Sequence, residues 1–134
     1  MEANQRPVPI GNELSAPFWE AARAGQLCVQ RCNACKRFQH PPESECLQCG
    51  SSKLAFTRVS GEATVYSFSV VRESITPGML PPYTVLVAQL AEQPDLKMLG
   101  SAKGILPLKI GQKLKVVFER ISDSTTIPQF VPAD

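Results

Sequence analysis

The sequence predicts a mostly β protein with an N-terminal helix, a rubredoxin-like zinc ribbon and a five-stranded OB-fold barrel. Two observations lead to this fold class. Four of the five cysteines form two C-x-x-C pairs within residues 32–49, and from residue 53 onward apolar and polar residues follow the period of strands. We therefore expect a flexible arm at residues 1–13, a helix and ribbon at residues 14–52, and the barrel at residues 53–134.

A short helix is expected directly after the arm. Ser15 is a candidate N-cap, Pro17 suits the first turn, and Gly25 is a suitable stop. Phe18 lies on the apolar stripe of this helix and Trp19 borders it. Two interpretations follow for these aromatic side chains: they pack onto the chain's own domain, or they bind a partner protein.

The two cysteine pairs carry the strongest chemical signal. Cys32 and Cys35 form the first C-x-x-C knuckle, and Cys46 and Cys49 form the second, which Gly50 follows. Two intervening residues let a tight turn direct both sulfurs at one ion, and two such turns complete a tetrahedral four-sulfur shell. A closed shell has no position for water or substrate, so we predict a structural zinc ion. Iron is the alternative metal, and disulfides are disfavoured in a reducing compartment.

Two further residues near the knuckles were considered as ligands. Cys28 is the one cysteine outside the two knuckles, and His40 is the only histidine of the chain. Because four sulfurs already complete the shell, we expect Cys28 to be a buried small residue or a free thiol. We expect His40 to pack against neighbouring residues or to face solvent.

The second part of the chain has the pattern of a small barrel. In the strand that begins near residue 63, Tyr66, Phe68 and Val70 are expected on one face. Gly100 suggests a bulge or bend in a later strand, and a short helix near Gly104 is an option. Strands are expected at residues 53–59, 63–71, 83–90, 97–102, 114–118 and 127–131.

Composition limits the class of function. The chain has 134 residues and a net charge of +2, which is too balanced to predict strong binding to nucleic acid or to a membrane surface. Its N-terminus lacks the basic start and apolar core of a secretory signal, so we expect a cytoplasmic protein. With a single histidine and no glycine-rich phosphate loop, the sequence predicts no catalytic residues.

Several short sequence motifs, taken in their order along the chain, resemble those of one known family. The resemblance covers roughly residues 14–121 and is to the acyl-CoA-associated zinc-ribbon/OB-fold family, catalogued as domain of unknown function thirty-five. The motifs are Pro17-Phe18-Trp19, Gly25-Gln26-Leu27, the two knuckles with Pro41-Pro42 between them, Gly61, Val65-Tyr66-Ser67, and the segment from Leu108 through Gly111 to Glu119.

The resemblance implies an accessory subunit rather than an enzyme. Members of the family accompany thiolase-like enzymes, including thiolases and the retro-aldol lyases that shorten steroid side chains as CoA thioesters. The small protein stabilises the larger subunit and helps form its acyl-CoA channel. For this chain the resemblance implies a separate thiolase-like partner, which we expect in a heterotetramer, and contact with acyl-CoA through the complex.

Two departures from the family pattern bear on CoA binding. Gly61-Glu62-Ala63 stands where Gly-x-Gly is often found, and the turn at residues 91–97 is longer than the family's acidic-Gly-x-Arg turn. We select Arg58, Arg72 and Lys97 as candidate contacts for CoA phosphates, because cations bind phosphate oxygens. The alternative is that they are solvated charges at strand ends.

Two other classes of function were weighed against the accessory subunit. Zinc ribbons and OB-folds also bind single-stranded nucleic acid, which requires a basic groove with interleaved aromatic residues. The third class is a self-sufficient thioesterase or acyltransferase, which the missing general base disfavours.

Overall fold

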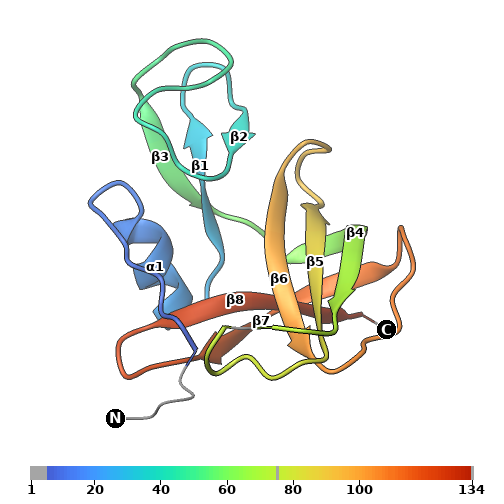
Figure 1. The fold of residues 1–134 in the computed structure, drawn as a ribbon. Helices are drawn as coiled ribbons and strands as arrows, with labels where there is room; N and C mark the ends of the chain where they lie inside the picture. The colour runs from blue at the N-terminus through green and yellow to red at the C-terminus, as the bar shows by residue number, and fades with distance from the viewer. Residues whose placement is uncertain (1–5, 75, 134) are drawn as a thin grey trace.

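The computed structural model describes residues 6–74 and 76–133. Within them, one helix and the strands of two sheets follow each other along the chain (Figure 1). This helix is too short and too polar to cross a membrane. The elements are α1 (Ala16–Arg23), β1 (Cys28–Cys32), β2 (Phe38–Gln39), β3 (Leu54–Arg58), β4 (Glu62–Val71), β5 (Tyr83–Leu90), β6 (Lys97–Lys103), β7 (Lys113–Arg120) and β8 (Thr126–Pro132).

Helix α1 begins and ends through local hydrogen bonds. The sequence suggested that the hydroxyl of Ser15 caps the helix, but it makes no capping hydrogen bond. It accepts the backbone N–H of Asn12 at 3.0 Å, and the side chain of Asn12 accepts the N–H of Ser15 at 2.9 Å. At the other end Gly25 has a φ of 76°, and the N–H of Gln26 donates to the carbonyl of Ala21. The expected stop at Gly25 is therefore confirmed.

The ribbon contains a three-stranded antiparallel sheet in the order β2-β1-β3. Strands β1 and β2 were not expected. Strand β3 was expected at nearly these residues, but as a strand of the barrel. It pairs with β1 instead, from Cys28 opposite Arg58 to Cys32 opposite Leu54. The reason is that β1 leads into the first knuckle and β3 leaves the second, so a shared metal site draws the two strands together.

The barrel is a five-stranded antiparallel sheet in the order β6-β5-β4-β7-β8. Its two edge strands, β6 and β8, approach each other without forming a backbone ladder. The buried side chain of Gln129 connects them: its oxygen accepts the N–H of Ser101 at 2.7 Å, and its amide donates to the Ser101 hydroxyl at 3.0 Å. No helix forms near Gly104, where residues 104–112 contain only bends and turns.

A β-bulge in β4 changes the expected faces of that strand. The register with β5 shifts between Val65 and Ser67, which leaves Tyr66 as the extra residue. Phe68 and Val70 lie opposite the buried Leu86 and Thr84 and share a face as expected, whereas Tyr66 lies on the outer face, so the expectation was wrong for Tyr66. Gly100, in contrast, interrupts nothing: β6 pairs with β5 in one continuous register through this glycine.

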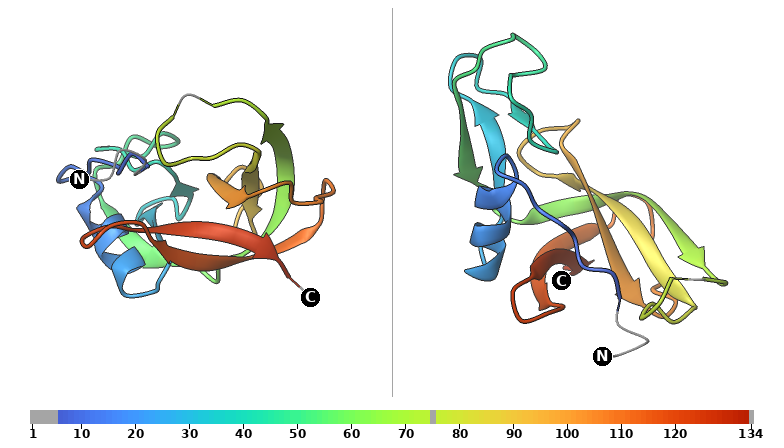
Figure 2. Two further views of the ribbon diagram at one scale, coloured as in Figure 1. Left: turned by 60° about the horizontal axis from the view of Figure 1, so that its bottom comes forward. Right: turned by 60° about the vertical axis from the view of Figure 1, so that its left-hand side comes forward.

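One hydrophobic core joins the helix, the ribbon and the barrel. Phe18, Leu27 and Val29 belong to the same buried cluster as Leu86 and Phe130 of the barrel. Figure 2 shows α1 beside the C-terminal strands, with the ribbon standing above the barrel. The metal-binding part of the chain is therefore anchored on the barrel through shared apolar packing.

Candidate metal centre

The two knuckles have the same backbone design. The N–H of Cys35 lies 3.4 Å from the sulfur of Cys32, and the N–H of Cys49 lies 3.4 Å from the sulfur of Cys46. The residue after each knuckle has a positive φ, 71° at Lys36 and 79° at Gly50. This conformation returns its N–H to the carbonyl of the first cysteine in each turn, at 2.9 Å. Both turns thus direct N–H groups at sulfur.

The four sulfurs fit one tetrahedral ion. All four lie within 4.8 Å of one another. The Cys32–Cys49 and Cys35–Cys46 pairs are each 3.6 Å apart, and Zn–S bonds of about 2.3 Å in a tetrahedron require a sulfur separation of about 3.8 Å. Residues Cys32, Cys35, Cys46 and Cys49 are therefore positioned to bind a metal ion.

Hydrogen bonds prepare some of these thiols for ionisation. The N–H of Cys35 is the main cause that lowers the pKa of Cys32 to about 6, and the N–H of Cys49 lowers the pKa of Cys46. For Cys49 the N–H of Ser51 acts in the same direction, but hydrogen bonds to the other sulfurs and burial outweigh it and raise the pKa to about 11. A metal ion would replace the protons that these sulfurs share.

Cys28 and His40 lie outside the cluster. Cys28 begins β1 and is half-buried, and burial raises the pKa of its thiol although Arg58 opposes this. The ring of His40 packs on Phe18, with 5.2 Å between centroids, and burial lowers the pKa of this histidine. Of the two roles expected for His40, the structure places it in packing.

A glutamine network supports the finger between the knuckles, and the sequence did not reveal it. Gln30 is buried in β1. Its side-chain oxygen accepts from the N–H of Glu43, and its amide donates to the carbonyl of Glu43, both at 2.9 Å. Gln39 donates to the same oxygen of Gln30. A polar residue at an inward position of a strand, as Gln30 is in β1, would have indicated the network. This signal can be read only once the strand itself has been recognised.

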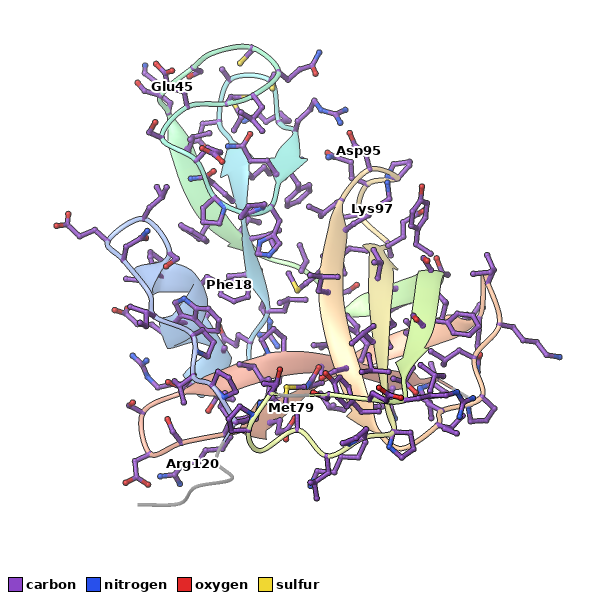
Figure 3. All side chains as sticks on the ribbon, viewed as in Figure 1. Phe18, Glu45, Met79, Asp95, Lys97 and Arg120 are labelled. Carbon is purple, nitrogen blue, oxygen red and sulfur yellow. The ribbon has the colours of Figure 1, made fainter. Side chains whose placement is uncertain are left out.

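The aromatic residues of α1 pack within the chain. Phe18 is 6% exposed and belongs to the core, and Trp19 is half-buried against it in an edge-to-face contact at 4.9 Å. Figure 3 shows Phe18 between α1 and β1. Next to these rings lies a largely apolar groove of about 690 Å³, bounded by the arm, α1, the ribbon finger at His40, and strands β6 and β8.

The candidate CoA contacts do not converge. Thr64 of β4, Gln89 of β5 and Lys97 of β6 form one row across the strands, at one end of the barrel sheet. Arg72 follows Val71 at the other end of β4, so it lies about 25 Å away along the strands at about 3.3 Å per residue. Arg58 is exposed at the end of β3 in the ribbon sheet. The three cations therefore do not form one phosphate site.

Comparison with known proteins assigns the fold and the ribbon to one family. Residues 19–55 match the family model described as the rubredoxin-like zinc ribbon domain of ChsH2, and residues 56–119 match its C-terminal OB-fold domain. The chain belongs to the ChsH2 family. This family is the zinc-ribbon/OB-fold family that the sequence motifs resemble, and the expected architecture of helix, ribbon and OB-fold is confirmed.

A solved structure covers nearly the whole chain. It is named Ltp2-ChsH2(DUF35) aldolase, with 32% identity, a TM-score of 0.85, and coverage of 94% of this chain and 99% of that one. A DUF35 protein of unknown function from Sulfolobus solfataricus shares the ChsH2-type fold, with a TM-score of 0.61 and 19% identity over 78% of each chain.

Two curated relatives are longer proteins. A probable enoyl-CoA hydratase alpha subunit of Thermomonospora curvata is 35% identical over 96% of this chain and 40% of its own length. A 3-oxo-4,17-pregnadiene-20-carboxyl-CoA hydratase alpha subunit of Mycobacterium tuberculosis is 30% identical over 76% of this chain and 32% of its own length. The present chain therefore spans less than half the length of either curated relative.

Proposed function

We propose that the chain is a non-catalytic accessory subunit of a thiolase-like acyl-CoA enzyme. The observation that carries this proposal is the similarity, over nearly all of both chains, to a structure named as an Ltp2-ChsH2(DUF35) aldolase. The longer relatives are named for CoA thioesters, and one of these names specifies a pregnadiene carboxylate. Both observations favour a complex that processes acyl-CoA, with a steroid side chain as the leading substrate class.

The chain's own residues support a structural role. The four cysteines would hold a zinc ion whose coordination shell is closed, and the ion would supply rigidity rather than a site for substrate. The longer turn at residues 91–97 then attaches the ribbon to the barrel. Gln93 accepts the N–H of Phe38 at 2.9 Å and donates to its carbonyl at 2.8 Å, and Asp95 pairs with Arg37. The complete unit would act as one rigid body on its partner.

The finer parts of the proposal concern CoA and the assembly. The chain would help form the acyl-CoA channel of a cytoplasmic heterotetramer with two larger subunits. Arg58, Arg72 and Lys97 are candidate phosphate contacts, and Lys97 and Arg72 would act independently because the barrel sheet holds them apart. Replacing each with alanine and measuring the KM of the complex for acyl-CoA identifies any that contacts the nucleotide.

The test is capture of partners by the tagged chain from its native cell extract, with metal analysis of the eluate. We expect a thiolase-like subunit in near-stoichiometric amount and one zinc ion per chain. The variant Cys46→Ser removes one metal ligand, and we expect it to lose both the zinc and the partner. Recovery of a zinc-loaded chain that is alone or bound to RNA would contradict the accessory role and favour the nucleic-acid module.

A further inference from the structure

The outer face of strands β4, β5 and β6 is apolar at its centre. Val85 and Val87 alternate with the buried residues of β5, so their side chains point outward. Leu99 lies opposite Val87 on β6 and is 74% exposed, and Tyr66 at the bulge of β4 is 51% exposed. We call these residues, Tyr66, Val85, Val87 and Leu99, the outer apolar face. Figure 1 shows the three strands on the side of the barrel away from α1.

The residues of the outer apolar face share it with Ser67 and Ser69, which lie opposite Val87 and Val85, but Leu99 and Tyr66 are large and exposed. An antiparallel sheet with one solvated face normally places polar residues outward, and grouped exposed apolar side chains mark interaction sites. Tyr66 points outward because it follows the inward Val65, and the bulge then places Ser67 beside it on the same face, opposite Val87. The outer apolar face is therefore built as a surface to be covered by another molecule.

The charges nearest to Leu99 on this face are positive, whereas Glu62, the carboxylate at an outward position of β4, lies at the start of that strand. Within the paired segments 64–71, 83–89 and 97–103 there is no aspartate or glutamate, and the lysines at the two ends of β6 bracket Leu99. The ammonium of Lys97 lies 4.2 Å from the ring centroid of Tyr66, and no carboxylate among the described residues pairs with it. The two lysines are about 20 Å apart at about 3.3 Å per residue.

Charge and size together select the kind of partner. A symmetric contact between two copies would bring the same lysine-bracketed patch against itself, so like charges would face one another. The face measures only about 300 Å², well under the roughly 800 Å² that each partner contributes to a stable interface. It continues over the edge of β6, because Lys97 and Leu99 also line the 690 Å³ groove.

We propose that the outer apolar face and the adjoining edge of β6 form the docking surface for the larger thiolase-like subunit. The partner surface would carry apolar side chains opposite Leu99 and carboxylates opposite Lys97 and Lys103, so that in this inference Lys97 contacts the partner protein in place of a CoA phosphate. This inference rests on the proposed function, since it names the surface through which the accessory role is exercised.

The test is binding of Leu99→Asp to the purified thiolase-like subunit that the wild-type chain captures, with the Ltp2 subunit of the similar complex as a second probe. The matched controls are Leu47→Asp on the ribbon and Leu80→Asp on the loop before β5. Their side chains are 76% and 80% exposed, compared with 74% for Leu99, so all three changes spare the core. Zinc content and thermal unfolding verify that each variant is folded.

We expect Leu99→Asp to weaken binding about a hundredfold, as for a charge introduced at an interface centre, while both controls bind like wild type. Lys97→Glu with Lys103→Glu should slow association and reduce its dependence on salt. Wild-type affinity for Leu99→Asp, or an equal loss in Leu47→Asp or Leu80→Asp, would overturn the assigned surface but leave the accessory role intact. A wild-type chain that captures no thiolase-like subunit from its extract and does not bind the Ltp2 probe would overturn the accessory role itself, and this inference with it.

Discussion

At the scale of single residues, Gly61 has two separate reasons to be glycine. Its φ is +85°, in the left-handed region. A Cβ at this position would also lie 2.3 Å from Cγ1 of Val116, whose N–H donates to the carbonyl of Gly61 at 2.9 Å. The position joins the ribbon to the first strand of the barrel, so both requirements act where the two parts of the chain meet.

The two requirements at Gly61 can be separated by a matched variant. Gly111 has the same φ of +85°, but a Cβ there would meet no atom within 4 Å. We expect Gly111→Ala to cost about 1–2 kcal/mol from backbone strain alone, and Gly61→Ala to cost about 2–4 kcal/mol because overpacking adds to it. Chemical denaturation measures both. Equal losses would show that the contact with Val116 relaxes freely.

The buried ring of His40 predicts a dependence of stability on pH. Burial lowers its pKa in the folded chain below the ordinary value of 6.5, so the unfolded chain binds the proton more readily. The contribution of this histidine is complete above pH 6.5 and is lost as the pH falls toward the folded pKa. We therefore expect the stability of the wild-type chain to fall, relative to that of His40→Leu, as the pH decreases below about 7.

The measurement is denaturant unfolding of both zinc-loaded proteins across this pH range. Loss of metal in acid affects the two chains alike and cancels in the difference of their unfolding free energies. Parallel curves for wild type and His40→Leu would mean that His40 does not titrate differently in the folded and unfolded chain.

At the scale of elements, the turn between β5 and β6 acts as a clamp on the ribbon. Figure 3 shows Asp95 at the tip of this turn, beside the ribbon. Gln93 gives the backbone of Phe38 the two hydrogen bonds that a neighbouring strand would give. The departure of this turn from the family pattern thus has a structural explanation within the chain.

This clamp predicts a local change in Gln93→Ala. The N–H of Phe38 would lose its acceptor, and we expect its hydrogen exchange to accelerate about tenfold while β4 and β5 keep their protection. The control is Gln89→Ala, which shortens a half-exposed glutamine on the outer face of β5. Unchanged exchange at Phe38 would show that Arg37 and Asp95 hold the ribbon without the help of Gln93.

The elements differ in how far the sequence predicts them. Five strands from β4 to β8 were expected within one or two residues, because alternation is a local signal. Strand β1 was missed because Cys28–Cys32 contains the metal ligand Cys32 and the buried Gln30 instead of an apolar alternation. Strand β3 was recognised but assigned to the wrong sheet, since pairing depends on distant residues.

The site shows the same division between local and distant information. The four cysteines were predicted because the geometry of each knuckle is contained in five consecutive residues. The positive φ at Lys36 was not, because glycine marks this position only in the second knuckle. The separation of Lys97 from Arg72 follows from strand register, which the spacing along the chain does not give.

At the scale of the whole molecule, one side chain closes the barrel. Gln129 is 6% exposed and joins β8 to Ser101 of β6, and its amide also lies 3.1 Å from a carboxylate oxygen of Glu119. A Cβ at Gly100 would lie 3.2 Å from the ring of Phe130, so this glycine lets the two edge strands approach. The closure thus combines a hydrogen-bonded amide with a close apolar contact.

Replacing Gln129 tests this closure. We expect Gln129→Ala to lower the unfolding free energy by about 1–3 kcal/mol, because the N–H of Ser101 loses its acceptor in a buried setting. Denaturant unfolding measures the loss, and Gln89→Ala again serves as a control on an outer position. A loss no larger than that of the control would mean that water replaces the amide and that the barrel closes without it.

The docking of α1 on β8 has a consequence for how the chain is made. Arg23 donates to the carbonyl of Ser124, 101 residues further along, and the helix packs beside the last strands of the barrel (Figure 2). A ribosome adds about 5–20 residues per second, so the first helix emerges on the order of 5–20 seconds before its binding surface exists. The helix is therefore made well before the strands on which it packs, and its aromatic side chains remain exposed to water until residues 113–132 have been synthesised.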